Sequence, residues 1–291
     1  MLKRINWSLI FYCFAWVAGL SGVIVLMSFI NVKKSELRCK ELKIVIPGTY
    51  NFIERAEIDE ILLKTQGPLT GRVLDKINIH EIEETLKANP FIEHAKVFSD
   101  MDGVINIHVR QREPVIRILN MTNQDYYIDK TGFKIPISNG FTARVPVGNG
   151  YIMEGFAQRV DTLKTKLARD LYKAALFIQK DTLWNHQIEQ FYVNSENEIE
   201  MIPRVGDHKI ILGNADSLET KFRNLLIFYK KALPLAGWDT YKTISVKYAN
   251  QIVCEKADAT DIQNKKNLQA PVANDTTLKP VQDTTNKILI Q

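Results

Sequence analysis

Histidine and cysteine are the residue types in this sequence that could bind a metal ion or act as nucleophiles. The histidines are scattered, and none belongs to an H-x-x-x-H or similar ligand pair. The cysteines form no C-x-x-C pair, so neither a zinc site nor a redox motif is indicated. We predict that the chain binds no metal and that its histidines lie on the surface or on strand faces: His80, His94, His108, His186 and His208.

The cysteines leave one disulfide to consider. Cys13 lies inside a long apolar segment, so only Cys39 and Cys254 could pair, and they sit at opposite ends of the folded region. The alternative is that all of them are small buried or lipid-facing residues. The sequence does not decide whether Cys39 and Cys254 ever pair.

Other patterns that could carry chemistry are weak. Gly148-Asn149-Gly150 matches no phosphate-binding spacing, and the neighbouring Pro146 and Tyr151 favour a loop. Gly19-Leu20-Ser21-Gly22 has the composition of a nucleophile elbow but lies in the apolar segment. No Asp or Glu pair can be assigned acid and base roles, because their separation in the fold decides that. We therefore predict no enzyme activity, no catalytic residue and no cofactor.

The composition is that of a mostly folded protein. Hydrophobic residues make up 45% of the 291 residues, which is ample for one large core or two modest ones. The formal net charge is +5, and Lys, Arg, Asp and Glu are interspersed rather than clustered. Because binding to phosphates requires a concentrated basic face, nucleic acid is not an expected partner.

The N-terminal region predicts a membrane-spanning helix. No charged residue occurs between Arg4 and Lys33, a stretch longer than the ~20 residues that cross a bilayer core. We assign residues 1–6 to a short cytoplasmic tail and residues 7–32 to the transmembrane helix. The alternative is a cleaved secretory signal, but its apolar region would be only ~7–15 residues long.

Charge alone does not fix the orientation of this helix. Basic residues flank it on both sides, so the positive-inside rule gives no answer. The very short N-terminal tail favours export of the C-terminal part, because large domains translocate largely regardless of charge. The flanking basic residues are Lys3 and Arg4 on one side and Lys33, Lys34, Arg38 and Lys40 on the other.

The region after the apolar segment predicts a small α+β unit. Alternating apolar residues indicate strands, and apolar residues at helical spacing indicate two helices, the second of which begins at Asn78 with Glu81 three residues on. The order is strand, helix, helix, strand, strand, which gives two helices on one face of a three-stranded sheet. The strands are expected at 42–46, 91–98 and 105–109, and the helices around 58–62 and 78–86.

The next region predicts a second, β-rich unit with flanking helices. A hairpin is expected at Tyr126–Gly132, where Gly132 permits a positive φ. Two amphipathic helices are expected at 163–178 and 218–233, with strands at 188–193, 199–203 and 209–212 between them.

The last expected strand covers 242–255, where apolar residues alternate with polar ones as in a strand with one buried face. A stretch rich in Asp, Thr, Asn, Gln and Lys follows. We predict that this tail, 257–291, is disordered, since it lacks the apolar residues that a core requires.

These motifs together resemble the bacterial cell-division protein family FtsQ/DivIB. The segment from Asn89-Pro90-Phe91 to Val97, followed by Ile105–Val109 and Arg112-Glu113-Pro114-Val115, is similar to the family's POTRA domain. Tyr126-Tyr127-Ile128-Asp129 and Ile211-Leu212-Gly213-Asn214 are similar to its second domain. The resemblance implies a POTRA domain (β-α-α-β-β) at 40–114 and a mixed β domain at 115–256.

The resemblance also implies a function. Proteins of this family are non-catalytic divisome scaffolds of the bacterial inner membrane, with C-terminal domains in the periplasm at the division septum, and they bind FtsB and FtsL through their last strands and the adjoining helix. An FtsB/FtsL-like partner would add its own strand to the edge of the sheet. The implied partner-binding residues are Val246, Lys247, Tyr248, Asn250, Gln251, Ile252 and Val253.

Two departures from the family pattern and two other functions stay open. Lys247 stands where the family commonly has Arg, and Asn250-Gln251 stands near the position of a common Gly. The closing strand could also be an ordinary strand whose Lys discourages aggregation. The chain could instead be a POTRA-containing membrane component of a secretion or outer-membrane assembly pathway, although no POTRA repeats are evident. An exported enzyme or sensor would require a deep polar pocket.

Overall fold

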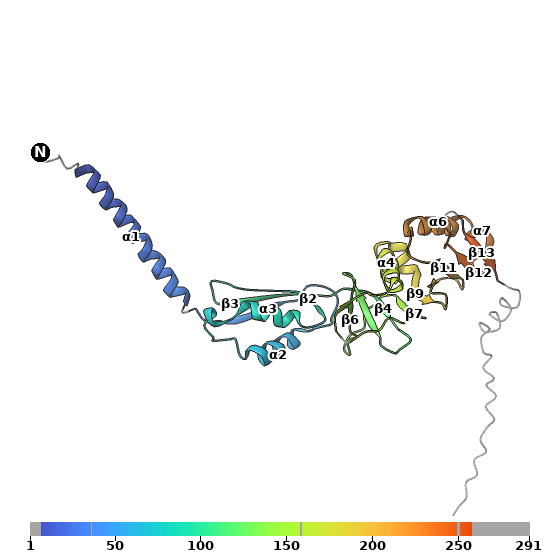
Figure 1. Ribbon diagram of the computed structural model, residues 1–291, viewed down its shortest axis with the longest axis horizontal. Coiled ribbons are helices and arrows are strands. Elements are labelled where there is room, and N and C mark those ends of the chain that lie inside the picture. The colour runs from blue at the N-terminus through green and yellow to red at the C-terminus, as the bar shows by residue number, and fades with distance from the viewer. Residues whose placement is uncertain (1–6, 36, 158, 249–250, 258–291) are drawn as a thin grey trace, which may run out of the picture.

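The computed structural model describes residues 7–35, 37–157, 159–248 and 251–257, and in the first helix it describes side chains only at 11–12 and 14–26. The described elements follow one another along the long axis, from α1 at one end to β12 and β13 at the other (Figure 1). The predicted tail at 1–6 and, apart from Ala257, the predicted disordered tail lie outside the described residues.

The apolar N-terminal segment forms α1 (Trp7–Ser35), a helix of 29 residues. Its described apolar side chains, among them Phe14, Leu20 and Ile24, are exposed. Within the part of the chain that the structure describes, no helix is both long enough and apolar enough to cross a membrane. The helix predicted at 7–32 is confirmed, and its crossing of a membrane stays a prediction.

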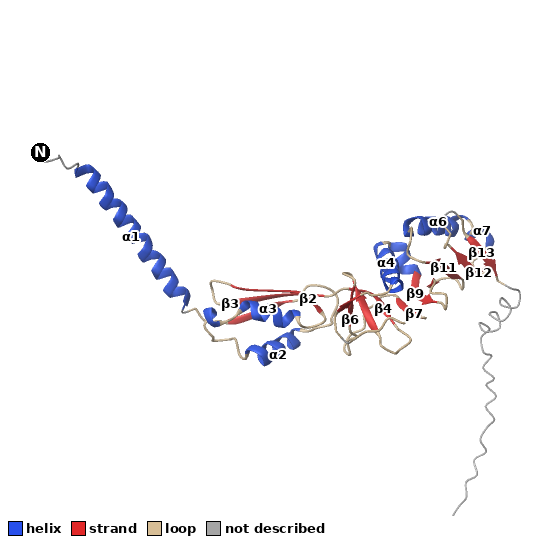
Figure 2. Cartoon of the chain, viewed as in Figure 1, coloured by secondary structure: helices blue, strands red, loops and turns tan. Residues whose placement is uncertain are grey.

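The first folded unit has the predicted strand-helix-helix-strand-strand order. Its strands form what we call the small sheet, in the order β1-β3-β2, with β1 parallel to β3 and β2 antiparallel to it. Both main helices lie on one face of this sheet (Figure 2). The elements are β1 (Glu41–Val45), α2 (Arg55–Gln66), a 3-10 turn η1 (Leu74–Lys76), α3 (Ile79–Lys87), β2 (Ile92–Ser99) and β3 (Val104–Gln111).

Local sequence signals account for this unit. The Asn78 side chain accepts a hydrogen bond from the Glu81 amide, as a helix cap should, and so fixes the start of α3. Ile82 and Leu86 on α3 are buried beside Ile58 of α2. Burying each such side chain stabilises the fold by about 1.5–3 kcal/mol before the entropy cost of ordering it.

The second folded unit is one sheet of ten strands, which we call the large sheet. Its order is β13-β12-β11-β10-β9-β7-β4-β5-β6-β8, and α4 and α6 cover one face of it (Figure 2). Its first half contains β4 (Pro114–Ile118), β5 (Tyr126–Asp129), β6 (Phe133–Ile135), β7 (Val147–Gly150) and β8 (Asp161–Thr162). The second half contains α4 (Lys166–Lys180), α5 (Thr182–Gln187), β9 (Ile188–Val193), β10 (Ile199–Pro203), β11 (Lys209–Gly213), α6 (Leu218–Lys231), α7 (Leu233–Ala236), β12 (Tyr241–Ser245) and β13 (Val253–Lys256).

The predicted loop at Gly148-Asn149-Gly150 is wrong, because these residues form β7. This strand lies between β4 and β9, parallel to both, and joins the two halves of the large sheet. A side chain at position 148 would come within 2.9 Å of Ile118 Cδ1. At position 150, where φ is 93°, it would collide with the Val193 carbonyl. The glycines therefore permit close packing inside a sheet, although in the sequence they have the composition of a loop.

The single closing strand predicted at 242–255 is also wrong in part. The structure has two antiparallel strands there, β12 and β13, which pair with each other. The apolar alternation continues from one strand to the other because Val246, just after β12, and Ile252, just before β13, both pack against the core. A period of two in the sequence thus does not distinguish one long strand from two short ones.

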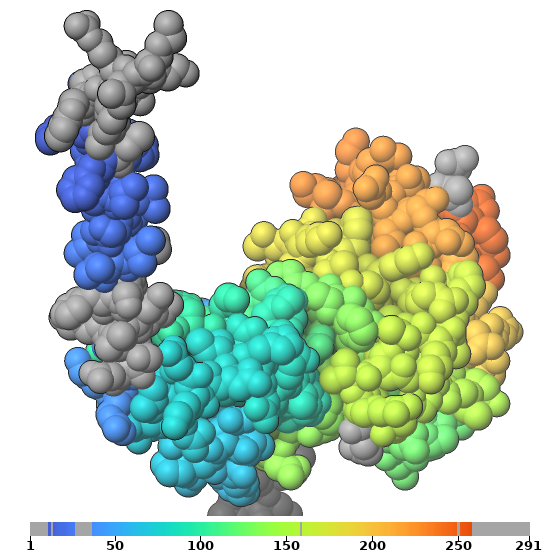
Figure 3. Space-filling view, turned by 60° about the vertical axis from the view of Figure 1, so that its left-hand side comes forward, coloured from blue at the N-terminus to red at the C-terminus, as the bar shows by residue number. Residues whose placement is uncertain are grey.

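An aromatic cluster joins the small sheet to the large sheet. The Phe52 ring stacks on Phe91 at a centroid distance of 5.4 Å and meets Phe141 edge-on at 5.0 Å and Tyr127 at 5.8 Å. Figure 3 shows the two units packed against each other, with the small-sheet unit in cyan and the start of the large-sheet unit in green. Such aromatic pairs contribute about 0.5–1.5 kcal/mol each beyond their burial.

Gln111 fixes the loop that carries this aromatic ring. Its side-chain oxygen accepts hydrogen bonds from the amides of Phe52 (2.8 Å) and Ile53 (3.0 Å), and its Nε2 donates to the Tyr50 carbonyl (2.7 Å). Gln111 is the last residue of β3 and is buried. The end of the small sheet thereby positions the Phe52 ring against the large sheet.

We expect Gln111→Leu to lower the free energy of unfolding by about 2–3 kcal/mol, because it leaves three backbone polar groups without their partner. Urea denaturation of the full-length chain in detergent measures the change. Gln179→Leu makes the same substitution on α4, away from the junction, and serves as the control. Equal unfolding midpoints for the two variants would contradict the role given to Gln111.

Candidate partner-binding edge

β13 forms one edge of the large sheet and pairs with β12 on one side only. The Val246 amide donates to the Ile211 carbonyl of β11 (2.9 Å), so the backbone at Val246 faces β11. By alternation, Ser245 faces β13, where it pairs with Val253. The next residue, Cys254, then directs its N–H and C=O groups away from β12. These groups are available to a strand from another chain.

A groove lies beside this edge, between α6 and the connection that leads to β13. Its volume is about 310 Å³. Ile227 and Phe228 of α6 contribute apolar surface, and Lys231 contributes a positive charge. Gln251 and Ile252 line the opposite side. An apolar side chain from a bound strand could enter this groove while the strand itself pairs with β13.

The first three predicted site residues differ in their placement. Val246 is 2% exposed and belongs to the core, so its side chain is not available to a partner. Lys247 forms an ion pair with Glu198, and its aliphatic stem packs over Gly213. Tyr248 is 50% exposed. Of the three, Tyr248 therefore presents the largest accessible surface.

The remaining predicted residues lie just before β13 or at its first position, except for Asn250, which is outside the described residues. Gln251 is exposed and Ile252 is half-buried, and both line the groove. Val253 is the first residue of β13 and is 46% exposed. The structure thus brings Gln251, Ile252 and Val253 together at the open edge.

The sequence interpretation implicated the adjoining helix but missed the residues of α6 that complete this surface. Ile227 is half exposed and lies on the face of α6 opposite the buried Phe222, Leu225 and Tyr229. An apolar residue on the otherwise polar face of an amphipathic helix is the signal that could have revealed it. Cys254 was missed as well, because its outward-facing backbone depends on the register of the sheet.

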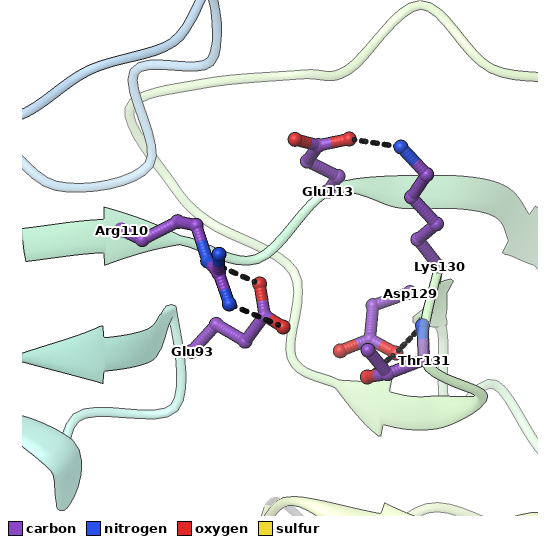
Figure 4. Close-up of a pocket in the computed structure, with 6 residues that line it drawn as sticks. All are labelled: Glu93, Arg110, Glu113, Asp129, Lys130 and Thr131. Atoms are coloured by element: carbon purple, nitrogen blue, oxygen red, sulfur yellow. Dashed lines mark hydrogen bonds and ion pairs between the residues drawn. The ribbon is translucent and has the colours of Figure 1, made fainter.

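A second depression lies at the junction of the two sheets and has a volume of about 200 Å³ (Figure 4). Charged side chains line it, and they are paired with one another. Arg110 binds Glu93 (3.1 Å), and Lys130 binds Glu113 (3.0 Å). The buried Asp129 accepts a hydrogen bond from the Thr131 amide (3.0 Å). The Lys130–Glu113 pair connects the β5–β6 turn to the β3–β4 link, whereas the Arg110–Glu93 pair joins β3 to β2 within the small sheet.

Comparison with known families follows this division of the chain. Residues 113–255 match the family described as FtsQ/DivIB, C-terminal related, and residues 37–110 match the POTRA-like domain. The chain has a POTRA-like domain followed by an FtsQ/DivIB-related domain. The resemblance to the FtsQ/DivIB family is therefore confirmed. A comparison with curated protein sequences found no match.

The family relation indicates a role related to cell division and, in general terms, partners within the divisome. The FtsQ/DivIB-related family is generally non-catalytic. In the described residues, no group of three or more His, Cys, Asp or Glu side chains could hold a metal ion. Cys39 and Cys254 are both free thiols, one in the core of the POTRA-like domain and the other on β13.

A buried lysine supports the open edge of the FtsQ/DivIB-related domain. Lys221 of α6 donates to the carbonyls of Leu212 (2.9 Å) and Asn214 (2.8 Å) and to the Asn214 side chain (3.0 Å). Burial lowers the pKa of this lysine, and the nearby Asp216 opposes the shift. The contacts fix the turn between β11 and α6, and so fix α6 relative to the last three strands.

His208 is not on the surface, which corrects the prediction for this residue. It lies just before β11 and is buried, with Nε2 at 2.7 Å from the Tyr229 hydroxyl of α6. Its Nδ1 has no hydrogen-bond partner in the described structure. Burial lowers the pKa of the imidazole below 6.5, although Asp207 opposes the shift. A single histidine in a sequence gives no sign of this environment.

We expect the domain to lose stability below about pH 6.5, because His208 takes up a proton more readily in the unfolded chain than in the fold. The free energy of unfolding should fall as the pH decreases from the ordinary histidine pKa toward the lowered one. His208→Gln should flatten this part of the curve, measured by urea denaturation from about pH 7.5 to 5.5. His80→Gln removes an exposed histidine and should leave the curve unchanged. Parallel curves for His208→Gln and the unmodified chain would refute the assignment.

Proposed function

We propose that this protein is a membrane-anchored, non-catalytic scaffold of the bacterial divisome, and that it binds FtsB/FtsL-like membrane proteins by adding a partner strand to β13. The observation that carries the proposal is the open edge of β13 at the end of a ten-stranded sheet. Main-chain hydrogen bonds to such an edge supply affinity, and adjacent side-chain pockets supply specificity. The groove beside α6 is such a pocket.

The partner-binding residues divide into backbone and side-chain contributors. Cys254 offers the outward backbone groups of the strand edge, Val253 beside it presents an exposed side chain, and Gln251 and Ile252 form one wall of the groove. Tyr248 supplies an exposed aromatic surface, the kind of side chain that dominates binding energy at interfaces. Val246 and Lys247 act indirectly, by holding the connection against β11 and the β9–β10 turn. Asn250 completes the proposed segment.

The proposed membrane anchor is α1. At about 1.5 Å per residue, a helix of 29 residues extends over about 44 Å, which exceeds the ~30 Å of a bilayer core. Between Arg4 and Lys33 the sequence has no charge. The anchor would hold the domains in the periplasm, at the inner membrane of the division septum, where they would coordinate septal peptidoglycan synthesis with earlier steps of assembly.

The FtsQ/DivIB-related match favours this function over a secretion or outer-membrane assembly role. The POTRA-like match covers only residues 37–110, and the larger match, 113–255, is to the division family. A scaffold of this kind links partners and carries out no reaction of its own.

Cys254→Pro should weaken binding of an FtsB/FtsL-like partner at least about tenfold. Proline removes the outward N–H, and its ring obstructs an incoming strand, yet an edge strand tolerates it because the β12 ladder does not use that group. Co-purification of the full-length chain with a tagged FtsB-like protein, titrated in detergent, measures the change. Cys254→Ala is the matched control, since it changes the side chain but keeps the N–H. Equal affinity of both variants for the partner would overturn strand addition at β13.

Leu20→Lys combined with Ile24→Lys should move the protein out of the membrane fraction. Each lysine near the centre of a spanning helix costs about 2.5–3.5 kcal/mol. Fractionation of cells, with immunoblotting for the full-length chain, measures the distribution. Lys33→Ala, at the end of the segment, should leave the protein in the membrane fraction. Retention of the double variant in the membrane would contradict the anchoring role of α1.

A further inference from the structure

The described structure has four strand edges: β1 and β2 in the small sheet, and β8 and β13 in the large sheet. Just before β1, the Cys39 amide donates to the Arg72 carbonyl (2.8 Å), and the Gly71 amide donates to the Cys39 carbonyl (2.7 Å). The segment around residues 71–73 therefore pairs with the chain that leads into β1, and not with Glu41–Val45 itself. At the far end of the large sheet, β8 has only two residues, and the Asp161 side chain accepts the Thr162 amide (2.8 Å).

A side chain from α3 occupies the middle of the β2 edge. β2 has eight residues, lies at the edge of the small sheet and is long enough to pair with another strand. Glu83 reaches it from α3, and its Oε1 accepts a hydrogen bond from the Val97 amide (2.8 Å). The Lys96 ammonium lies 3.5 Å from the same oxygen. An isolated strand edge would leave the outward-facing Val97 amide to water or to another chain.

Glu83 is well suited to this contact. Its side chain is 13% exposed, so the hydrogen bond is shielded from water. The hydrogen bond from Val97 lowers the pKa of the Glu83 carboxyl group, and this effect is larger than the opposing effect of burial. Glu83 is therefore ionised at neutral pH. A hydrogen bond from an amide to a carboxylate is stronger than one between neutral groups. A competing strand would have to displace it.

We propose that Glu83 guards the β2 edge, and that without it β2 would pair with the β2 strand of a second copy of this chain. Two identical edges pair antiparallel about a two-fold axis. Pairing about Val97 replaces the Glu83 contact with Val97–Val97 hydrogen bonds. It also places Lys96, whose side chain is 75% exposed, opposite Phe98 of the other copy, which is 41% exposed. A lysine over an aromatic ring is a favourable pair.

The contact of Glu83 with the β2 edge also affects where a partner strand binds. This step rests on the proposed function. With Glu83 bonded to the β2 edge and β8 reduced to two residues, β13 is the open edge of the large sheet in the described part of the chain. Edge protection therefore directs a partner strand to β13 and keeps the β2 edge from forming strand-mediated assemblies. Glu83 acts as a specificity-determining residue although it lies in the other domain.

Self-association of the full-length chain in detergent tests the proposal. Analytical ultracentrifugation should show that Glu83→Ala dimerises at least about tenfold more tightly than the unmodified chain, and hydrogen exchange should show the Val97 amide protected only at dimer-forming concentrations. Glu83→Gln retains a side-chain oxygen that can accept the Val97 hydrogen bond, so it should remain monomeric. Glu84→Ala is the matched control, because this neighbouring glutamate is exposed and pairs with Lys87 instead.

The outcomes are separable from those of partner binding. If Glu83→Ala remains as monomeric as Glu84→Ala while circular dichroism shows it folded, the guard is refuted. Dimerisation in which the Val97 amide is not protected would also refute it, because the contact would then lie elsewhere. Dimerisation of Glu83→Ala, together with unaltered partner binding by Cys254→Pro, would support the guard and reject strand addition at β13.

Discussion

The Phe52 ring occupies the point where the POTRA-like domain meets the FtsQ/DivIB-related domain, and the arrangement of the two domains depends on it. The ring is enclosed by Phe91 from the first domain and by Tyr127 and Phe141 from the second. Gln111 holds the backbone beside the ring, and only two residues separate β3 from β4. A short covalent link and an aromatic contact therefore act together. The link limits the distance between the domains, and the contact opposes their rotation.

Charged groups around this contact reinforce it. Arg112, in the link, binds Asp129 of β5 at 2.7 Å, and both side chains are largely buried. The Asp129 carboxylate also accepts the amide of Phe133, which starts β6. Because breaking one partner of a buried pair leaves an uncompensated charge, such a pair enforces one geometry even where its net contribution to stability is small. The polar pocket at the junction is thus part of the domain connection.

In the proposed function, the groups that bind the partner belong to the backbone. Strand addition uses amide and carbonyl groups that every residue has, so a sheet must cover the edges it does not use. Here two devices do so: a two-residue strand at β8 and the Glu83 carboxylate at β2. The open edge at β13 differs from these edges by the absence of such a cover in the described residues. In the proposed function, the groove beside this edge would select which strand can bind.

The sequence by itself determined the elements whose signals are local. Helical spacing and the Asn78 cap gave α2 and α3, alternation gave β2, β3 and β9, and the family motifs gave the order of the domains. The sequence also indicated strand structure at the end of the β domain, in residues 242–255. It did not show that 242–255 contains two strands, because an alternation of apolar residues continues through a turn whenever both strands face the same core.

Only the tertiary structure decided the features that depend on which strands are neighbours. The glycines of β7 predict a loop, but in the structure they form a strand because β4 and β9 pair on both sides of them. The sequence does not show that His208 is buried against Tyr229 of α6, or that Lys221 of α6 is buried against the end of β11. Ile227 becomes part of a groove only because the connection before β13 lies beside it. The availability of a strand edge also depends on the neighbours of that strand. A strand's sequence specifies which face is apolar, but whether its amides are paired depends on the strands and side chains beside it, such as Glu83 at β2.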